Sequence, residues 1–451
     1  MILIKRRRLI SWLFKAYIKK WGKQAIFFFV LGLIVFYLLL TGSKLIIDKI
    51  PFLEQERIGI TGLYTADNLP GIVISKMSEG LTKISENGLP IPGAAKKWEI
   101  KDNGKTYIFY LADKKFNDGT RVTSKQINYN FLDVEVERPN DLTIIFKLKE
   151  TYAPFLITTS RPIFKNGYIG ISEFKVKSLN LNGTFVDTIT LVSTKNKYKT
   201  IHYQVYPTEE SLRTAFVLGE VSRAIGVYNT TFKNKELKNF KNTEIKKQID
   251  FSKLVTIFYN TKDPVLSEKK LRTGLSYAIP DDFSEGLRNS TPFSPYSWAS
   301  STLTSFVQDL PHAESLILST QSATGSGELS FTLKTLPKYE NLAKKIQSTW
   351  KKIDINIEIE KVESRPNDFQ IYLGDFNLPK DPDQYSLWHS EQVNNISNYK
   401  SLRIDKLLED GRKNVQIEKR QKIYSDLQKY LLDDSPATFI YFPYTYDLIR
   451  K

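Results

Sequence analysis

Residues that could carry out catalysis are few and scattered in this chain of 451 residues. Its three histidines, His202, His312 and His389, lie far apart in the sequence, and none forms a paired zinc motif such as H-E-x-x-H. The chain has no cysteine, which excludes disulfides, thiolate metal sites and a cysteine nucleophile. It also lacks the G-x-S-x-G elbow, the Walker A loop and a G-x-G-x-x-G turn after a strand. No motif therefore points to an enzyme, although scattered Asp, Glu and Ser residues leave a hydrolase open.

Aromatic residues in loop-like segments are the more informative signal, and they suit binding. Phe, Trp and Tyr make up 13% of the chain. Several stand beside Pro, Ser and Asp, as in the segments 292–298 (PFSPYSW) and 381–390 (DPDQYSLWHS). Rigid amphipathic rings bury a large area at low entropic cost, so such loops make good binding surfaces. The same rings could instead hold the loops against the core.

Strands and helices that alternate along the chain must position these loops. Strands are expected where apolar and aromatic residues alternate, at residues 105–111, 142–148, 254–259 and 355–360. Helices are expected from capping residues and apolar spacing, at residues 208–218, 339–353, 403–413 and 417–432. The small polar segment 319–327 (STQSATGSG) predicts a flexible surface loop. This mixture of strands and helices predicts α/β layers.

The net charge of +16 would suggest a nucleic acid or an anionic membrane as partner, and its distribution favours the membrane. Residues 1–23 hold eight basic residues and no acidic one, and predict a basic cytoplasmic arm. The uncharged run 24–43 follows directly and would span about 30 Å as a helix, the thickness of a bilayer core. The basic flank predicts that the N-terminus stays in the cytoplasm and that the bulk of the chain lies outside.

A cleaved signal peptide is the competing interpretation of the apolar run. Signal peptides usually have an apolar core of about 7–15 residues, which is shorter than the run found here. The residues Thr41, Gly42 and Ser43 would also make a poor small-residue cleavage site. We therefore favour an uncleaved transmembrane signal anchor at 24–43.

Four blocks of sequence follow the anchor in a fixed order. The first block lies within 79–123 and contains AAKKWEI, DNGKTYIFYL and KFNDGTRVT. The second is YQVYPTEE at 203–210, followed by LGE, and the third is YNT at 259–261, followed by LRTGLSYAI. The fourth is DPDQYSLWHS at 381–390, followed by Arg420 and Tyr424. In these blocks and their order the chain resembles the extracytoplasmic solute-binding proteins of peptide ABC importers, the family that binds oligopeptides, dipeptides or nickel.

The resemblance implies a fold of two α/β lobes joined by a hinge, the type II periplasmic-binding-protein fold, with the ligand enclosed between the lobes. It places lobe I at 57–253, lobe II at 254–431, and a return to lobe I at 432–451 that includes residues 438–442. Family members usually carry a long helical excursion after the segment that matches 127–131. Here a strand-like stretch follows almost at once, so we expect a reduced small subdomain within lobe I.

The resemblance also implies a set of ligand-binding residues. In the family the main chain of a bound peptide is held by main-chain groups, and its α-amine by an aspartate near the DPD segment. The candidates here are Asp375 and Asp381, with Asp383 behind them. Asp381 could equally cap a helix or brace its loop. The other candidates are expected on the cleft wall, and these are Trp388, His389, Tyr64, Tyr296 and Trp298.

The first hypothesis for function is a membrane-anchored solute-binding protein that captures extracellular peptides and delivers them to an ABC transporter permease. A tethered receptor or interaction module with the same fold and no transport role is the alternative, and an extracytoplasmic hydrolase is the third. We expect no cofactor, because no His or Cys cluster supports the nickel or haem that some relatives bind. The expected partners are a peptide or other small solute, the permease subunits and the membrane, without nucleic acid.

Overall fold

The computed structural model describes most of the chain, namely residues 12, 15–17, 19–24, 26–37, 55–301, 306–324 and 329–451. Near the N-terminus, the helix Lys19–Tyr37 is long and apolar enough to cross a membrane, and its side chains are not buried in the protein. A signal sequence would pass the same test. The last residues of the expected anchor, 38–43, lie outside the described residues. The segments 56–195 and 201–451 form one compact unit, to which the rest of this description applies.

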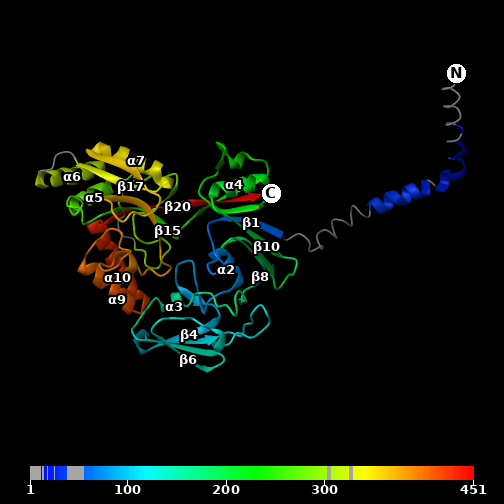
Figure 1. Ribbon diagram of the computed structural model, residues 1–451, viewed down its shortest axis with the longest axis horizontal. Coiled ribbons are helices and arrows are strands. Elements are labelled where there is room, and N and C mark those ends of the chain that lie inside the picture. The colour runs from blue at the N-terminus through cyan, green and yellow to red at the C-terminus, as the bar shows by residue number, and fades with distance from the viewer. Residues whose placement is uncertain are drawn as a thin grey trace, which may run out of the picture. The chain divides into compact units, whose positions relative to one another are not determined.

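A sheet of twelve strands passes through the compact unit (Figure 1). Ten strands follow the order β18-β17-β19-β15-β20-β11-β1-β10-β9-β8, and β14 and β16 also pair with β20. The bounds are β1 (Gln55–Thr61), β8 (Phe174–Asn182), β9 (Phe185–Ser193), β10 (Thr200–Tyr206), β11 (Arg223–Val227), β14 (Thr243–Ile249), β15 (Lys253–Tyr259), β16 (Gly286–Arg288), β17 (Leu329–Thr335), β18 (Ile355–Lys361), β19 (Ile371–Asn377) and β20 (Ala437–Arg450).

Strand β20 belongs to both lobes. Its first residues pair with β15, where Ala437 lies opposite Phe258, and its last residues pair with β14, where Arg450 lies opposite Thr243. A strand of 14 residues can serve both partners because it extends about 45 Å. Residues 438–442, which we expected in lobe I, pair with β15 and β16. These residues pack in the two apolar clusters of lobe II, and lobe I receives only the second half of the strand.

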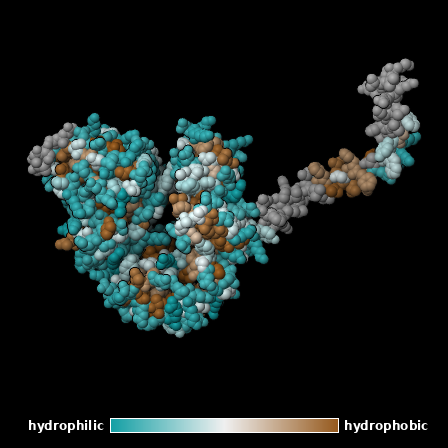
Figure 2. All heavy atoms as spheres, viewed as in Figure 1, coloured by the Kyte–Doolittle hydropathy of each residue, from teal (hydrophilic) through white to brown (hydrophobic). Residues whose placement is uncertain are grey.

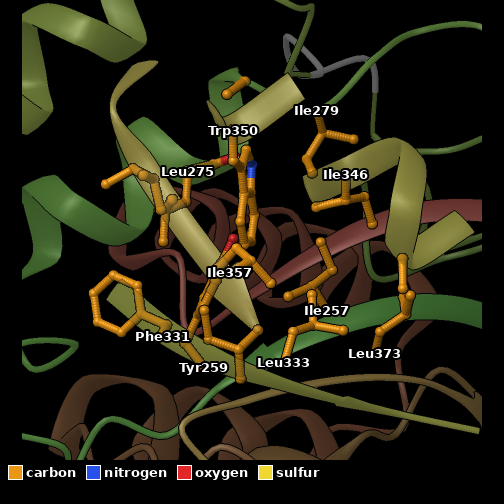
Figure 3. Close-up of a cluster of buried hydrophobic side chains, with 14 of the residues drawn as sticks. Ile257, Tyr259, Leu275, Ile279, Phe331, Leu333, Ile346, Trp350, Ile357 and Leu373 are labelled. Carbon is orange, nitrogen blue, oxygen red and sulfur yellow. The ribbon is translucent and has the colours of Figure 1, made fainter. Parts of the chain in front are cut away.

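Lobe II is built on both faces of β15, β17 and β19. The side chains of β15 alternate between two clusters: Ile257 and Tyr259 face one, and Leu254 and Phe258 face the other. Figure 3 shows the first cluster, where the indole of Trp350 stands among aliphatic side chains from the strands and helices. The helices of the lobe are α5 (Lys269–Tyr277), α6 (Leu310–Thr324), α7 (Glu340–Trp350), α8 (Tyr385–Trp388), α9 (Leu402–Lys413) and α10 (Ile417–Asp434).

Helix α6 corrects one expectation, because its last turns occupy most of the segment 319–327 that was expected to be a loop. The hydroxyls of Ser319 and Thr320 donate back to the carbonyl oxygen of Leu316, at 2.7 and 3.0 Å, so these polar residues fit within the helix. The helix packs on α5 at Gly274, where an added Cβ would lie 3.1 Å from the carbonyl oxygen of Ala313. Residues 325–328 lie outside the described residues.

The small subdomain of lobe I is a separate antiparallel sheet in the order β4-β5-β7-β6. Along β5, Tyr107, Phe109 and Leu111 are buried and alternate with half-buried residues, as the sequence predicted. The expected strand at 142–148 is confirmed as β7. The bounds are β2 (Thr82–Ile84), β3 (Pro90–Pro92), β4 (Ala95–Lys101), β5 (Thr106–Leu111), β6 (Val134–Asn140), β7 (Thr143–Leu148) and α3 (Phe155–Thr158).

The remainder of lobe I surrounds β1 and β11, with helices α2 (Gly71–Met77) and α4 (Glu209–Leu218) and the short hairpin of β12 (Thr231–Phe232) and β13 (Lys235–Glu236). The predicted start and end of α4 are confirmed. The Thr208 hydroxyl accepts a hydrogen bond from the Ser211 backbone, and Gly219 ends the helix with a φ of 85°. Helices and strands predicted at 254–259, 339–353, 355–360, 403–413 and 417–432 are also confirmed within a few residues at each end.

Candidate functional site

Asp375 lies on β19, where it is opposite Val255 of β15. Its carboxylate Oδ1 is 2.9 Å from the Nζ of Lys338, which belongs to the short 3₁₀ helix Pro337–Tyr339. The aspartate side chain is 13% exposed, and the lysine side chain is 50% exposed. Burial raises the pKa of the Tyr339 phenol, and the negative charge of Asp375 raises it further. Asp375 is thus a partly buried carboxylate whose cationic partner is half exposed to solvent.

A second lysine stands near Asp375, at the point where the chain passes from lobe I to lobe II. The Nζ of Lys253 donates to the Tyr228 hydroxyl at 3.1 Å, and this hydroxyl lies 3.4 Å from a carboxylate oxygen of Asp250. Burial lowers the pKa of Lys253, but the bond to Tyr228 and the charges of Asp375 and Asp250 more than offset this, so the pKa lies above its ordinary value. We call Tyr228, Asp250, Lys253, Lys338 and Asp375 the hinge cluster. Its lysines and aspartates balance in formal charge.

Asp381 has a different environment, because it is paired with a buried arginine. Arg420 Nη1 donates to Asp381 Oδ2 at 3.0 Å, and Arg420 Nη2 donates to the other carboxylate oxygen. The Asp381 side chain is only 8% exposed, and the Arg420 side chain is only 4% exposed. Arg420 also donates to the carbonyl oxygen of Gly411 and to the hydroxyl of Tyr424. Asp381 in addition accepts the backbone N–H of Asp383, so both of its oxygens are engaged within lobe II.

Asp383 is paired in the same way with Arg412, whose Nε lies 2.7 Å from its carboxylate. Burial raises the pKa of Asp383, and the charge and hydrogen bond of Arg412 oppose that rise. The guanidinium of Arg412 also lies over the ring of Tyr385, 3.8 Å from its centroid. The carboxylate of Asp383 is therefore bound on one side by Arg412 and on the other by the Tyr385 backbone N–H.

Trp388 and His389 end helix α8 and lie inside lobe II. The Trp388 side chain is fully buried, and its indole N–H donates to the amide oxygen of Gln384 at 2.8 Å. The His389 ring stacks on Tyr385, with 4.2 Å between the ring centroids. Its Nε2 lies 3.7 Å from a carboxylate oxygen of Glu409 on α9. In this conformation the fully buried Trp388 offers no surface to a ligand.

The three remaining aromatic candidates lie in different places. The hydroxyl of Tyr64 donates to the carbonyl oxygen of Thr61, and its ring packs on the apolar cluster of lobe I. Tyr296 is 63% exposed, with its ring edge-on to Phe251 at the hinge. Trp298 is buried against the guanidinium of Arg420. The structure therefore brings Trp298 and Asp381 together but leaves Tyr64 apart from them.

A cavity of about 250 Å³ lies between the small subdomain and lobe II, beside the hinge. It is lined by the hairpin loop 84–88, by Phe251 and Ser252, and by residues of the loops 293–297 and 378–384. The loop 378–384 directly follows the strand that carries Asp375. Figure 2 shows the surface hollowed between the part that carries α5–α10 and the part that carries α4 and β1 in the same view.

A second cavity, of about 240 Å³, lies on the other side of Gly88 and is more enclosed. Trp298, Asp381 and Arg420 form its lobe II wall, and Tyr107 with neighbouring aliphatic residues forms its small-subdomain wall. Direct hydrogen bonds join lobe II to the small subdomain around this cavity. The Ala153 backbone N–H donates to the carbonyl oxygen of Arg412 at 2.7 Å, and the Trp298 N–H donates to that of Asn87 at 3.1 Å.

Sequence reasoning missed the cationic members of the hinge cluster. Lys338 follows a proline at a helix start, where a lysine is normally a solvated residue, and no spacing rule relates it to Asp375, 37 residues later. Lys253 is the first residue of a strand whose other residues are apolar or aromatic apart from Thr256, and nothing in this pattern predicts that the lysine lies near Asp375. Within the described ranges there is no group of three or more His, Cys, Asp or Glu residues that could hold a metal ion.

The chain is similar to known proteins both in sequence and in structure. The family model described as bacterial extracellular solute-binding proteins, family 5, matches residues 90–398. The oligopeptide-binding protein AppA of Bacillus subtilis is 24% identical over 477 residues, covering 89% of this chain and 86% of AppA. The structure of AppA from Bacillus subtilis with a nonapeptide aligns with a TM-score of 0.65 at 21% identity, over 88% of this chain and 95% of that one. NikZ from Campylobacter jejuni with Ni(L-His) aligns with a TM-score of 0.70 at 20% identity, over 88% and 94%.

Proposed function

Because the chain belongs to the bacterial extracellular solute-binding proteins of family 5, we propose that it captures peptides in the cleft between its lobes and delivers them to an ABC transporter permease. The membrane part of this proposal is supported by the apolar helix Lys19–Tyr37 and the basic residues before it. The peptide part is supported by the hinge cluster and by the cavity beside it. Binding without catalysis is proposed, since the similar proteins are named for what they bind.

Asp375 carries the proposal, because it is the candidate carboxylate with an exchangeable partner. Arg420 and Arg412 hold Asp381 and Asp383 through buried or largely buried contacts, so a ligand amine would have to break a structural ion pair to reach either one. The partner of Asp375 is a half-exposed lysine, and such pairs contribute little to stability. We therefore assign the α-amine of the peptide to Asp375.

The rest of the ligand would extend from Asp375 toward the 250 Å³ cavity. The loop 378–384 leads from the end of β19 into the cavity wall, and the hairpin loop 84–88 faces it from the small subdomain. Loops of this kind present backbone N–H and C=O groups, which can hydrogen-bond a peptide main chain of any sequence. Closure of two lobes around those polar groups excludes water and strengthens each bond.

The test is calorimetric titration of the full chain in non-ionic detergent with alanine peptides of two to six residues. We expect binding of free-amine peptides to wild type, and a loss of at least tenfold in affinity in Asp375→Asn. The matched control is Asp426→Asn, an exposed aspartate on α10, which should bind as wild type does. Absence of binding to every peptide, with a heat signal for the Ni(L-His) complex instead, would replace peptides by amino-acid metal complexes as the ligand.

A further inference from the structure

Lys338 places a primary ammonium group where the proposed ligand would place its own. Its Nζ is 2.9 Å from Asp375 and lies over the ring of Tyr339, 4.7 Å from the centroid. The α-amine of a peptide is also a primary ammonium, with the same charge and the same capacity to donate hydrogen bonds. One carboxylate oxygen therefore already has the type of partner that a peptide would bring.

The contacts of Lys338 allow it to leave this position. Its side chain is half exposed, and the structure gives its ammonium one ion pair and one ring contact. Arg420 is the opposite case, because several hydrogen bonds hold its guanidinium in a buried position. Lys253, the other cation of the hinge cluster, is held by Tyr228. Lys338 is thus the cation of the cluster that a ligand can most readily displace.

This exchange has different consequences for two classes of peptide. A peptide with a free α-amine must separate Lys338 from Asp375 before its own ammonium can pair there. A peptide with a blocked, uncharged N-terminus can leave the pair intact, so that Asp375 is not left as an unpaired carboxylate in the closed cleft. The lysine therefore weakens the binding of free-amine peptides, and it removes the cost of an unpaired carboxylate from the binding of blocked peptides.

We propose that Lys338 is a specificity-determining residue that competes intramolecularly for Asp375 and so widens the ligand range to include peptides with uncharged N-termini. This inference rests on the proposed function and names the regulation of that same site. The ratio of affinities for free-amine and blocked peptides is set by the lysine. Removal of the lysine increases that ratio.

The experiment measures binding of tetra-alanine and N-acetyl-tetra-alanine to the full chain in non-ionic detergent, by calorimetry at low ionic strength. The variants are Lys338→Met, which keeps the length of the side chain, and Lys338→Arg, which keeps the charge. The matched control is Lys344→Met, which removes a surface lysine that pairs with Glu340 one turn away on α7.

We expect Lys338→Met to raise the ratio of affinities by about 2- to 5-fold, the range that a surface ion pair can account for. Lys338→Arg and Lys344→Met should leave the ratio near the wild-type value. An unchanged ratio, or weaker binding of tetra-alanine to Lys338→Met, overturns the inference while leaving peptide binding in place. If neither peptide binds wild type or any variant, the proposed function fails and the inference falls with it.

Discussion

The substitution Asp381→Asn tests most directly whether Asp381 is a structural carboxylate, in contrast to Asp375, which is proposed to bind the ligand. It removes the negative charge from the ion pair of Asp381 with Arg420, in which both side chains are almost completely buried. The arginine does not lose its proton: burial lowers its pKa, but its contacts with Tyr424 and Asp381 more than offset this, so the pKa lies above the ordinary value. After substitution a full positive charge would remain in the interior with only neutral partners, the carbonyl oxygen of Gly411 and the Tyr424 hydroxyl among them.

The size of the effect follows from this geometry. Removal of one partner from a buried ion pair destabilises a protein by about 3–5 kcal/mol, because the other charge is left uncompensated. The pair of Asp375 with Lys338 is different, since the lysine is half exposed and can turn into solvent. Fully exposed pairs contribute about 0.2–1 kcal/mol, and this pair, with one half-exposed partner, is expected to lie nearer that range than the range of a buried pair. We therefore expect Asp381→Asn to reduce the free energy of unfolding several times more than Asp375→Asn does.

The assay is urea unfolding of the full chain in non-ionic detergent, followed by tryptophan fluorescence, because urea leaves the ionic strength unchanged. Peptide affinity is measured on the same samples where the variants remain folded. Asp381→Asn should lose stability, whereas Asp375→Asn should keep its stability and lose affinity. The reasoning is refuted if Asp381→Asn unfolds within about 1 kcal/mol of wild type, or if Asp375→Asn is the less stable of the two.

Two further predictions concern stability away from the cleft. Trp350→Phe keeps an aromatic ring but leaves the carbonyl oxygen of Leu275 without the indole N–H that lies 3.1 Å away, which should reduce the free energy of unfolding by about 1–3 kcal/mol. Trp350→Ala also opens a cavity and should reduce it by about 3–5 kcal/mol. Both are measured by urea unfolding, and equal losses of stability in the two variants would contradict this prediction. Burial lowers the pKa of His202, and the charges of Lys177 and Arg57 lower it further, so the unfolded chain takes up the proton first and stability should fall as the pH drops below about 6.5. His202→Gln should reduce this slope between pH 7.5 and 5.5, and an unchanged slope would show that His202 does not cause it.

Local elements of this fold follow from short-range rules, and the sequence was sufficient for them. Thr208 and Gly219 delimit α4 because a side-chain hydroxyl caps the first turn and a glycine accepts the left-handed conformation at the end. Alternating burial predicted β5 because successive side chains of a strand point to opposite faces. The helix α6 was missed at 319–324 because its hydroxyls bond within the helix and its apolar side packs on α5, a contact that composition does not reveal.

The roles of the three candidate aspartates were beyond the sequence for a different reason. Asp375, Asp381 and Asp383 lie within nine residues of one another and have the same chemistry, so no local pattern separates them. Their partners come from positions 29 to 39 residues away, and the exposure of each partner differs. Whether a carboxylate can accept a ligand depends on the desolvation and the displaceability of its counter-ion, and these are properties of tertiary packing. The sequence alone indicated the family, the predicted helices and strands outside 319–324, and the set of candidate residues. Only the tertiary structure distinguished Asp375, whose counter-ion is half exposed, from the other two aspartates.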